Sequence, residues 1–368
     1  MRKIIIFSGA YLPGYKNGGP LRTIVNVVDA LGDEYDFHIV CRDRDHGDVA
    51  PYPNVKRNAW NCVGKAKVWY VSPGGFTDEL ILELVHGMDC IYLTSFYVDY
   101  GYKTLLLKRR GKIQQSVYLA PMGVFSAGAL AQKTMKKKVF IAVCKMLGLF
   151  KGITWSVTSG LEAEDLKRAI GKEVKYVIAE DLPRSNVPGR MSPQHDPMRV
   201  AFLSRICRMK NLLRAIEELK KTKARLHFTI YGPAEDLPYW QKCQRELQHL
   251  PGNITWEYAG NVPAESVQDA LAQNDVFFFP TLGENYGHVI FEALSVGCIP
   301  VISDQTPWQR IADQGAGYVL PLDGCFAEVL DSLAWNAHRD EMASKAVQIA
   351  QETVEKNRKS TGYRTIFG

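Results

Sequence analysis

The chain has 368 residues, of which 46% are hydrophobic and 23% are charged, so wholesale disorder is excluded and two domains are expected. Its eight cysteines are scattered without a C-x-x-C pair, which argues against a zinc site and a disulfide framework and favours a reducing compartment. The net charge is +6, and no apolar run approaches the roughly 18 residues of a membrane span, so we expect a cytoplasmic protein.

Short apolar segments alternate with amphipathic segments along the first half of the chain. The apolar segments predict strands at 3–8, 36–41, 66–71, 90–93, 116–119, 154–158 and 175–178. Helical periodicity between them predicts helices at 20–31, 78–86, 102–108 and 162–170. Near-continuous apolar strands separated by helices indicate a parallel sheet that is covered on both faces.

The second half repeats this alternation. Strands are predicted at 199–203, 226–231, 254–258, 276–279, 299–302 and 318–320, and helices at 211–221, 239–250, 266–273, 287–296 and 308–313. We therefore predict an α/β protein in which two Rossmann-like, doubly wound parallel-sheet domains face a central cleft. One large α/β domain with an irregular loop is the alternative.

Domain boundaries follow from a proline-rich segment. Residues 183–197 contain four prolines in fifteen residues and no periodicity, so they are predicted to be the linker. The amino-terminal domain then spans 1–182 and the carboxy-terminal domain 198–339. The last helix, at about 340–368, is expected to pack back on the amino-terminal domain.

A glycine-containing turn follows the first predicted strand. Gly18 and Gly19 lie just before Pro20, a residue favoured in the first helical turn. Glycines there allow the backbone to approach a ligand closely, and amides at a helix start suit a phosphate. A turn that binds no ligand explains the same residues equally well.

Arg205 and Lys210 lie between the predicted strand 199–203 and the next helix. Both side chains can converge on an anion at that helix start. Solvated surface charges are the alternative for this pair.

Two glutamates eight residues apart follow the predicted strand 276–279. Glu284 lies in the turn and Glu292 in the second helical turn, so the helix amino terminus lies between them. At helical rise they are separated by about 12 Å. This spacing suits two acceptors that bind different hydroxyl-bearing rings, with backbone amides on the phosphates between them. A structural ion pair is the alternative, because Glu292 interrupts an apolar helix and needs a partner.

The E-x7-E pattern from Glu284 to Glu292, followed by G-C-I-P-V-I-S-D from Gly297, resembles the retaining glycosyltransferases of family GT4, of the bacterial surface-polysaccharide type. These enzymes have the GT-B fold. Residues 204–211 resemble the Arg-x4-Lys element of that family, and residues 17–20 resemble its first-domain glycine loop. The resemblance covers most of the chain and is strongest from 198 to 322.

The resemblance implies that residues 1–182 form the acceptor-side domain and residues 198–339 the nucleotide-sugar donor-binding domain. It also implies a role for each matching residue. Arg205 and Lys210 would bind the donor diphosphate and stabilise the departing charge, with Glu284 beside the donor sugar as the third catalytic residue. Glu292 would hold the nucleotide ribose. Further donor contacts are implied for Gly18, Gly19, Asn285, Tyr286, Gly287 and His288. The donor would be a nucleotide-diphosphate sugar, with a UDP-sugar favoured, and neither a metal nor another cofactor is expected.

Three positions limit the resemblance. Residues 92–99 lack the histidine that many relatives carry after a strand, so no catalytic histidine is expected in the first domain. Met122 stands where close relatives often have arginine, which leaves the acceptor contacts open. Asp43 and Asp45 have the D-x-D spacing of metal-dependent glycosyltransferases, but the flanking charges favour a solvated loop.

A basic stretch without acidic residues lies between Asp99 and Glu162 and contains eleven lysines and arginines. Within it, residues 133–151 combine six lysines with an apolar set on one predicted helical face: Val139, Phe140, Val143, Met146, Leu147 and Phe150. A basic amphipathic helix suits an anionic membrane surface. A core-packing helix with a solvated lysine edge is equally consistent. Nucleic acid is not expected, since no base-reading motif accompanies the charge.

Together these interpretations predict a retaining glycosyltransferase that moves a sugar from a nucleotide-diphosphate sugar to a saccharide or lipid-linked saccharide. We expect it to act in polysaccharide, O-antigen or capsule assembly, in the cytoplasm and peripherally at the inner face of the membrane. The alternatives are a non-catalytic binding module of the same fold, for nucleotide sugars or membrane surfaces, and a nucleotide-sugar epimerase.

Overall fold

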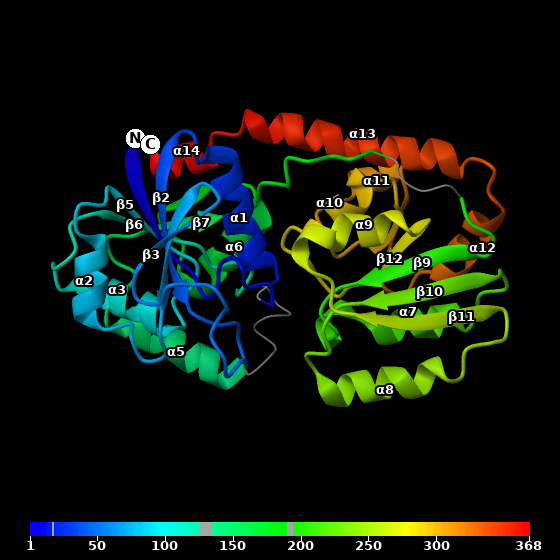
Figure 1. Ribbon diagram of the computed structural model, residues 1–368, viewed down its shortest axis with the longest axis horizontal. Helices are drawn as coiled ribbons and strands as arrows, with labels where there is room; N and C mark the ends of the chain where they lie inside the picture. Colours follow the sequence, from blue (N-terminus) through cyan, green and yellow to red (C-terminus); the bar gives the residue numbers. More distant parts are fainter. Residues whose placement is uncertain (17, 126–133, 190–193) are drawn as a thin grey trace. The chain divides into compact units, whose positions relative to one another are not determined.

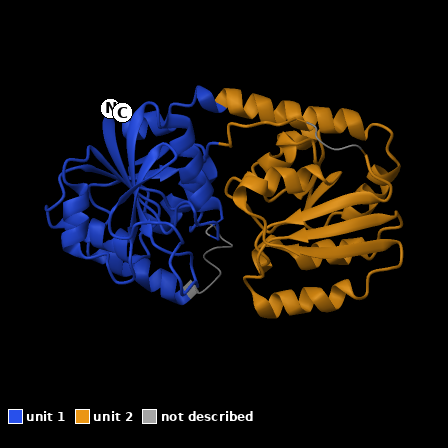
Figure 2. Cartoon of the chain, in the orientation of Figure 1, with its two compact units in different colours: residues 1–182, 357–368 blue, residues 183–356 orange. Residues whose placement is uncertain are grey.

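The computed structural model describes residues 1–16, 18–125, 134–189 and 194–368. It divides the chain into two compact units, the first formed by Met1–Leu182 with Asn357–Gly368 and the second by Pro183–Lys356 (Figure 2). In each unit, helices lie on both faces of a central sheet (Figure 1). This confirms the predicted α/β class with two Rossmann-like parallel-sheet domains.

The first unit contains an eight-stranded sheet in the order β3-β4-β2-β1-β5-β6-β7-β8. Its strands are β1 (Arg2–Phe7), β2 (Tyr35–Arg42), β3 (Trp60–Val63), β4 (Ala66–Val71), β5 (Cys90–Leu93), β6 (Ser116–Leu119), β7 (Thr154–Val157) and β8 (Tyr176–Ile178). The helices are α1 (Gly19–Leu31), α2 (Asp78–Val85), α3 (Asp99–Arg109), α5 (Thr134–Met146), α6 (Gly160–Ile170) and α14 (Gly362–Phe367). All pairings are parallel except the edge pair of β3 with β4, which was not predicted.

The central strand β1 shows why the sheet is buried on both sides. Ile5 and Phe7 pack into the core on one face, whereas Ile4 and Ile6 pack into the core on the other. Successive side chains of a strand point to opposite faces, so only a continuous apolar run can fill both cores.

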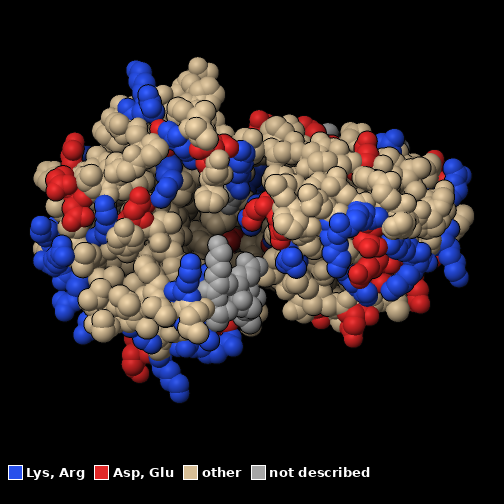
Figure 3. Space-filling view, turned by 90° about the horizontal axis from the view of Figure 1, so that it is seen from below, with Lys and Arg blue, Asp and Glu red and all other residues tan. Residues whose placement is uncertain are grey.

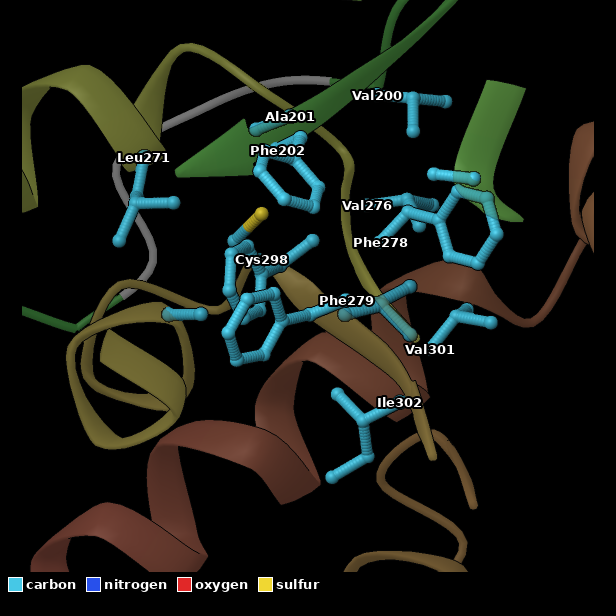
Figure 4. Packing of buried hydrophobic residues seen from close by; sticks show 14 of the residues in the cluster. Val200, Ala201, Phe202, Leu271, Val276, Phe278, Phe279, Cys298, Val301 and Ile302 are labelled. Carbon is cyan, nitrogen blue, oxygen red and sulfur yellow. The ribbon is translucent and has the colours of Figure 1, made fainter. Parts of the chain in front are cut away.

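The second unit contains a six-stranded, wholly parallel sheet in the order β11-β10-β9-β12-β13-β14. Its strands are β9 (Met198–Leu203), β10 (Leu226–Tyr231), β11 (Ile254–Gly260), β12 (Val276–Phe279), β13 (Ile299–Ser303) and β14 (Tyr318–Leu320). Its helices are η1 (Arg208–Lys210), α7 (Leu212–Leu219), α8 (Leu237–Leu247), η2 (Ala264–Ser266), α9 (Val267–Ala272), α10 (His288–Ser295), α11 (Arg310–Asp313), α12 (Phe326–Trp335) and α13 (Arg339–Arg358). Figure 4 shows the aromatic residues of β9 and β12, such as Phe202 and Phe278, in its core.

The boundaries differ from the predicted ones in two places. The described part of the expected linker belongs to the second unit, where Val187 packs on the core and the Gly189 amide donates to the Ser295 carbonyl at 3.0 Å. Residues 190–193 lie outside the described residues. Most of α13 also belongs to the second unit, because residues such as Ala346 and Ile349 face its core. Only the chain from Asn357 onward packs on the first unit.

Candidate active site

The predicted site segments meet where the strand order of the second sheet reverses. The chain winds outward from β9 through β10 to β11, and then restarts on the other side of β9 with β12. Val200 pairs with Val276 and Ala201 with Phe277, so the loops after β9 and β12 leave the same edge side by side. Open parallel sheets bind ligands at this kind of switch point.

The loop after β9 carries Arg205 and ends in the short helix η1, whose last residue is Lys210. Asn211 follows with a φ of 59°, a left-handed conformation that asparagine tolerates better than most residues. Its Nδ2 donates to the Pro280 carbonyl at 2.9 Å. Asn211, the N-cap residue of α7, therefore also ties this loop to the end of β12.

The loop after β12 is bound to both neighbouring loops. The Met209 carbonyl accepts from the Leu282 amide at 2.9 Å and from the buried Thr281 hydroxyl at 3.2 Å. The Glu284 amide donates to the Gln305 carbonyl, beyond β13, at 3.0 Å. These bonds fix the backbone that presents the Glu284 side chain.

Lys210 and Glu284 form an ion pair. Only 16% of the Lys210 side chain and 11% of the Glu284 side chain are exposed. Glu284 Oε1 lies 3.4 Å from the Thr281 hydroxyl oxygen, and Lys210 Nζ lies 5.7 Å from the centroid of the Phe279 ring. The structure thus joins a predicted cation to a predicted carboxylate in a partly desolvated position, where charge acts more strongly than in water.

Arg205 contacts a different carboxylate. Its Nη1 lies 2.5 Å from Glu235 Oε2, and both side chains are substantially exposed. Glu235 follows β10 in a polar turn, and nothing in its sequence neighbourhood distinguished it from other surface glutamates. Sequence reasoning therefore missed it.

The close approach between the loops after β9 and β10 depends on Gly232. Its φ is +121°, and a Cβ there would lie 1.9 Å from the Ser204 carbonyl oxygen. The Pro233 carbonyl accepts from the Ile206 amide at 2.8 Å. Glycine at this position thus lets the turn after β10 press against the Arg205 loop.

Residues 285–288 form the entry to α10. Gly287 is its N-cap residue with a φ of 81°, a left-handed conformation that favours glycine. The Tyr286 carbonyl accepts from Trp308 Nε1 at 2.5 Å, and the Tyr286 ring lies 4.8 Å from the ring of His288, centroid to centroid. Trp308, which was not predicted to act here, therefore anchors the loop that contains Asn285.

Glu292 is buried in the second turn of α10, between the buried side chains Phe291 and Ala293. It lies one helical turn beyond the helix start, whereas Glu284 precedes that start, as the spacing predicted. The roles assigned to the site residues remain predictions.

Gly18 and Gly19 belong to the first unit, where Gly18 caps α1 with a φ of 58°. A Cβ on Gly19 would meet nothing within 4 Å, so packing within the chain does not require glycine there. Residue 17, the first of the glycine loop, lies outside the described residues.

The expectation that Asp43 and Asp45 form a solvated loop is wrong, because both side chains are buried. Asp43 Oδ1 accepts from Arg44 Nε at 2.8 Å, and Asp45 accepts from the Tyr15 amide and the Tyr52 hydroxyl. Over the described ranges, no group of three or more histidine, cysteine, aspartate or glutamate side chains is arranged to hold a metal ion.

A buried carboxylate holds the loop after β6. Glu162 Oε1 accepts from the Gly123 amide at 2.6 Å, and its Oε2 accepts from the amide and hydroxyl of Thr158 at 2.7 and 2.9 Å. Burial raises the pKa of Glu162, and these hydrogen bonds oppose the shift. Met122, in the held loop, has a φ of 51°.

The basic segment 134–151, which contains α5 and the turn after it, has two apolar faces rather than the single predicted one. Phe140 packs on Tyr97 with ring centroids 5.3 Å apart, and Phe150 packs on the core. The other predicted members are exposed, Val139 by 55% and Met146 by 79%, and Met135 joins them. This stripe of exposed apolar residues consists of Met135, Val139, Val143, Met146 and Leu147. Residue 133 of the predicted segment lies outside the described residues.

Lysine and arginine side chains are interspersed with uncharged surface over the first unit (Figure 3). Throughout the described parts of the chain, no helix combines the length and apolar character needed to cross a bilayer.

Comparison with known proteins supports the interpretation of the second unit. Residues 197–336, which lie within the second unit, match the family described as Glycosyl transferases group 1. The search of curated proteins found no match.

Solved structures resemble the whole chain in fold. A sucrose-phosphate synthase from Thermosynechococcus elongatus matches with a TM-score of 0.71 and 15% identity, over 100% of this chain and 96% of that protein. HepE of Anabaena, in complex with UDP-glucose, matches with a TM-score of 0.72 and 14% identity, over 100% and 99%. WaaG, a glycosyltransferase involved in lipopolysaccharide biosynthesis, matches with a TM-score of 0.65 and 12% identity, over 98% of each chain. The chain therefore has the GT-B fold of these glycosyltransferases.

Proposed function

We propose that this chain is a retaining, metal-independent glycosyltransferase of the GT4 type that uses a nucleotide-diphosphate sugar, with a UDP-sugar favoured. The observation that carries the proposal is the ion pair of Lys210 with Glu284 at the switch point of a group 1 glycosyltransferase domain. The UDP-glucose in the HepE complex supports this choice of donor.

In the proposed reaction, Lys210 and Arg205 bind the diphosphate and stabilise the negative charge that develops as the sugar departs. Positioned cations that act on developing charge in a water-poor site are among the largest contributions to catalysis. Glu284, held by Thr281 and the Gln305 carbonyl, lies beside the donor sugar. Glu292 binds the ribose hydroxyls. The acceptor attacks on the face that the diphosphate leaves, and the leaving phosphate accepts the acceptor proton.

A panel of nucleotide sugars tests this proposal before any acceptor is known. UDP-glucose, UDP-galactose, UDP-N-acetylglucosamine and GDP-mannose are each incubated with the full chain, and slow release of nucleoside diphosphate is measured. We expect release from at least one donor, and loss of that release in Lys210→Ala.

The same panel separates the alternatives. A donor that is isomerised without release indicates an epimerase, and a donor that binds without either change indicates a non-catalytic module. If none of the four is bound or hydrolysed, the proposed function is wrong.

We further propose that α5 docks on an anionic membrane surface, which places the enzyme near a lipid-linked saccharide acceptor in surface-polysaccharide assembly. The support is the stripe of exposed apolar residues beside exposed lysines such as Lys136, Lys138 and Lys145. Each lysine near anionic lipid contributes about 1 kcal/mol, and buried apolar side chains add to it.

Flotation with vesicles containing phosphatidylglycerol tests the docking. Binding is expected at low salt, with a marked loss in the double variant Val139→Ser, Met146→Ser. Leu161→Ser is the matched control, because Leu161 is a similarly exposed apolar residue of the first unit outside α5. If the unmodified chain does not float with the vesicles at low salt, the membrane proposal is wrong, and the proposed donor chemistry is unaffected.

A further inference from the structure

A hollow of about 860 Å³ lies within the first unit. It is lined by the loop after β1, by residues 45–55 after β2, and by the β3–β4 edge. The strands β1, β2 and β4 are parallel, so these loops gather at the carboxyl edge of the sheet, where α/β proteins bind ligands. Small-molecule sites usually have volumes of about 300–1,000 Å³, and this hollow lies within that range.

The wall of the hollow is fixed by hydrogen bonds around the buried Asp45 carboxylate. One oxygen accepts from the Tyr15 amide at 3.0 Å and the other from the Tyr52 hydroxyl at 2.9 Å. The Tyr70 hydroxyl donates to the Leu12 carbonyl. A Cβ on Gly14 would lie 2.2 Å from the Tyr52 hydroxyl and 2.9 Å from Asp45 Oδ1, so only glycine fits there. Three distant chain segments are thus held in one arrangement before any ligand binds.

The exposed surface of the hollow combines aromatic and apolar faces with a charged rim. Tyr15 is 45% exposed, and Pro13 and Val49 line the hollow beside it. At the rim, Lys16 Nζ lies 2.5 Å from Asp48 Oδ1. Flat rings beside hydrogen-bonding groups match a sugar, whose C–H faces pack on aromatic rings while its hydroxyls donate and accept at the edges.

The charged residues that line the hollow restrict the class of ligand that can bind there. Two carboxylates, Asp45 and Asp48, line the hollow, and Lys16 balances only one of them. A phosphorylated or uronic sugar would approach a net negative wall. An aliphatic chain would remove water from the Lys16–Asp48 pair without replacing its hydrogen bonds. An uncharged sugar satisfies both the aromatic faces and the polar rim.

We propose that this hollow binds an uncharged sugar unit of the saccharide acceptor. The inference rests on the proposed glycosyltransferase function and names the acceptor chemistry that the first unit recognises. Tyr15 provides the ring on which the sugar packs, and the two carboxylates of Asp45 and Asp48, set against the single ammonium of Lys16, exclude acidic sugars.

Saturation-transfer NMR on the full chain tests the proposal with methyl glycosides of glucose, galactose, N-acetylglucosamine and glucuronic acid, each with and without UDP. We expect transfer to at least one uncharged glycoside and none to the glucuronide. Tyr15→Ala should weaken binding by about tenfold, as loss of an aromatic anchor commonly does. The Tyr15 bond to Asp45 uses the backbone amide, so this variant keeps the loop.

Trp335→Ala is the matched control, because Trp335 is an exposed aromatic residue that does not line the hollow. It should leave the NMR signal unchanged. Asp48→Asn should admit the glucuronide, since it removes a negative charge and frees the Lys16 ammonium. Absence of transfer to every uncharged glycoside in both conditions, or equal transfer in Tyr15→Ala, overturns the inference.

These measurements are independent of the donor chemistry. Sugar binding without nucleotide-sugar hydrolysis would contradict the proposed function but retain the hollow as a sugar site. Hydrolysis without sugar binding would support the proposed function and contradict the assignment of the hollow as a sugar site.

Discussion

The Lys210 ammonium is paired with the Glu284 carboxylate, although 74 residues separate them in the chain. Each residue comes from a loop at the carboxyl edge of the second sheet, and the two loops are joined by the bonds of Asn211 and Met209. The pair is largely shielded from water. A diphosphate that binds Lys210 must therefore share this ammonium with Glu284, which brings the carboxylate next to the donor.

Lys210→Met is expected to lower turnover by roughly 10²–10³-fold, as loss of a group that stabilises developing charge does in other enzymes. Acceptor-independent donor hydrolysis provides the measurement. Lys220→Met is the control, because Lys220 also forms an ion pair, 2.5 Å from Glu246, but lies outside the site. Similar rates in the two variants would refute the role of Lys210.

Arg205→Ala should lower turnover by roughly 100-fold, whereas Arg208→Ala should change it by less than about twofold. Both arginines form surface ion pairs, Arg205 with Glu235 and Arg208 with Asp236, so lost surface pairing affects both variants alike. The ratio of their kcat values isolates the contact of Arg205 with the diphosphate. Equal effects of the two substitutions would argue against that contact.

Glu292→Gln should weaken UDP binding by about tenfold, because the proposed charge-assisted hydrogen bond to a ribose hydroxyl would be replaced by a neutral one. Isothermal calorimetry measures the dissociation constant. The substitution conserves side-chain size in a buried position, and the melting temperature of the variant is measured alongside so that a change in stability is distinguished from a change in binding. An unchanged dissociation constant would rule out the ribose contact.

Gly232→Ala should destabilise the protein by about 3 kcal/mol, because the new Cβ cannot fit against the Ser204 carbonyl and the φ is unfavourable for alanine. It should also displace the Arg205 loop and weaken UDP binding. Gly252→Ala provides the control, since a Cβ there would meet nothing within 4 Å. Urea denaturation compares the two variants, and equal midpoints would contradict the argument.

The alternation of strands and helices and the shared sheet edge of the site loops were predictable because their signals are local. An apolar run followed by a polar turn predicts where a strand ends, and the ends of parallel strands share one edge. Arg205, Lys210 and Glu284 lie in the loops that follow such ends, and Glu292 lies in the helix that follows the second of these loops. Their common edge thus followed from the order of the elements.

The remaining features depend on contacts that periodicity does not encode. Val139 and Phe140 are adjacent and both apolar, so the pattern predicts a helix but not which of the two side chains faces the core. Asp45 is held by the Tyr15 amide, which comes from the loop after β1, and by the Tyr52 hydroxyl, which lies seven residues further along the same loop. The partner of Arg205 is an ordinary surface glutamate. Each outcome was decided by tertiary packing.

Asp181 gives the stability of the first unit a predictable pH dependence. Its side chain is buried and accepts a hydrogen bond from the Thr23 hydroxyl at 2.8 Å. Burial raises the pKa of Asp181 to about 7, the Thr23 bond opposes the shift, and the charge of Glu162 adds to it. The Asp181 carboxyl therefore keeps its proton up to a higher pH in the folded state than in the unfolded chain.

From this difference, the contribution of Asp181 to stability is full below about pH 4 and is lost as the pH rises to about 7. Asp181→Asn keeps an oxygen for the Thr23 hydroxyl but cannot ionise. The melting temperature of the variant, relative to the unmodified chain, should rise from about pH 5 to about pH 8 and then level off. Glu173→Gln, an exposed carboxyl change in the same unit, should show no such trend. A constant difference for Asp181→Asn across this range would show that the buried carboxyl does not titrate as its surroundings require.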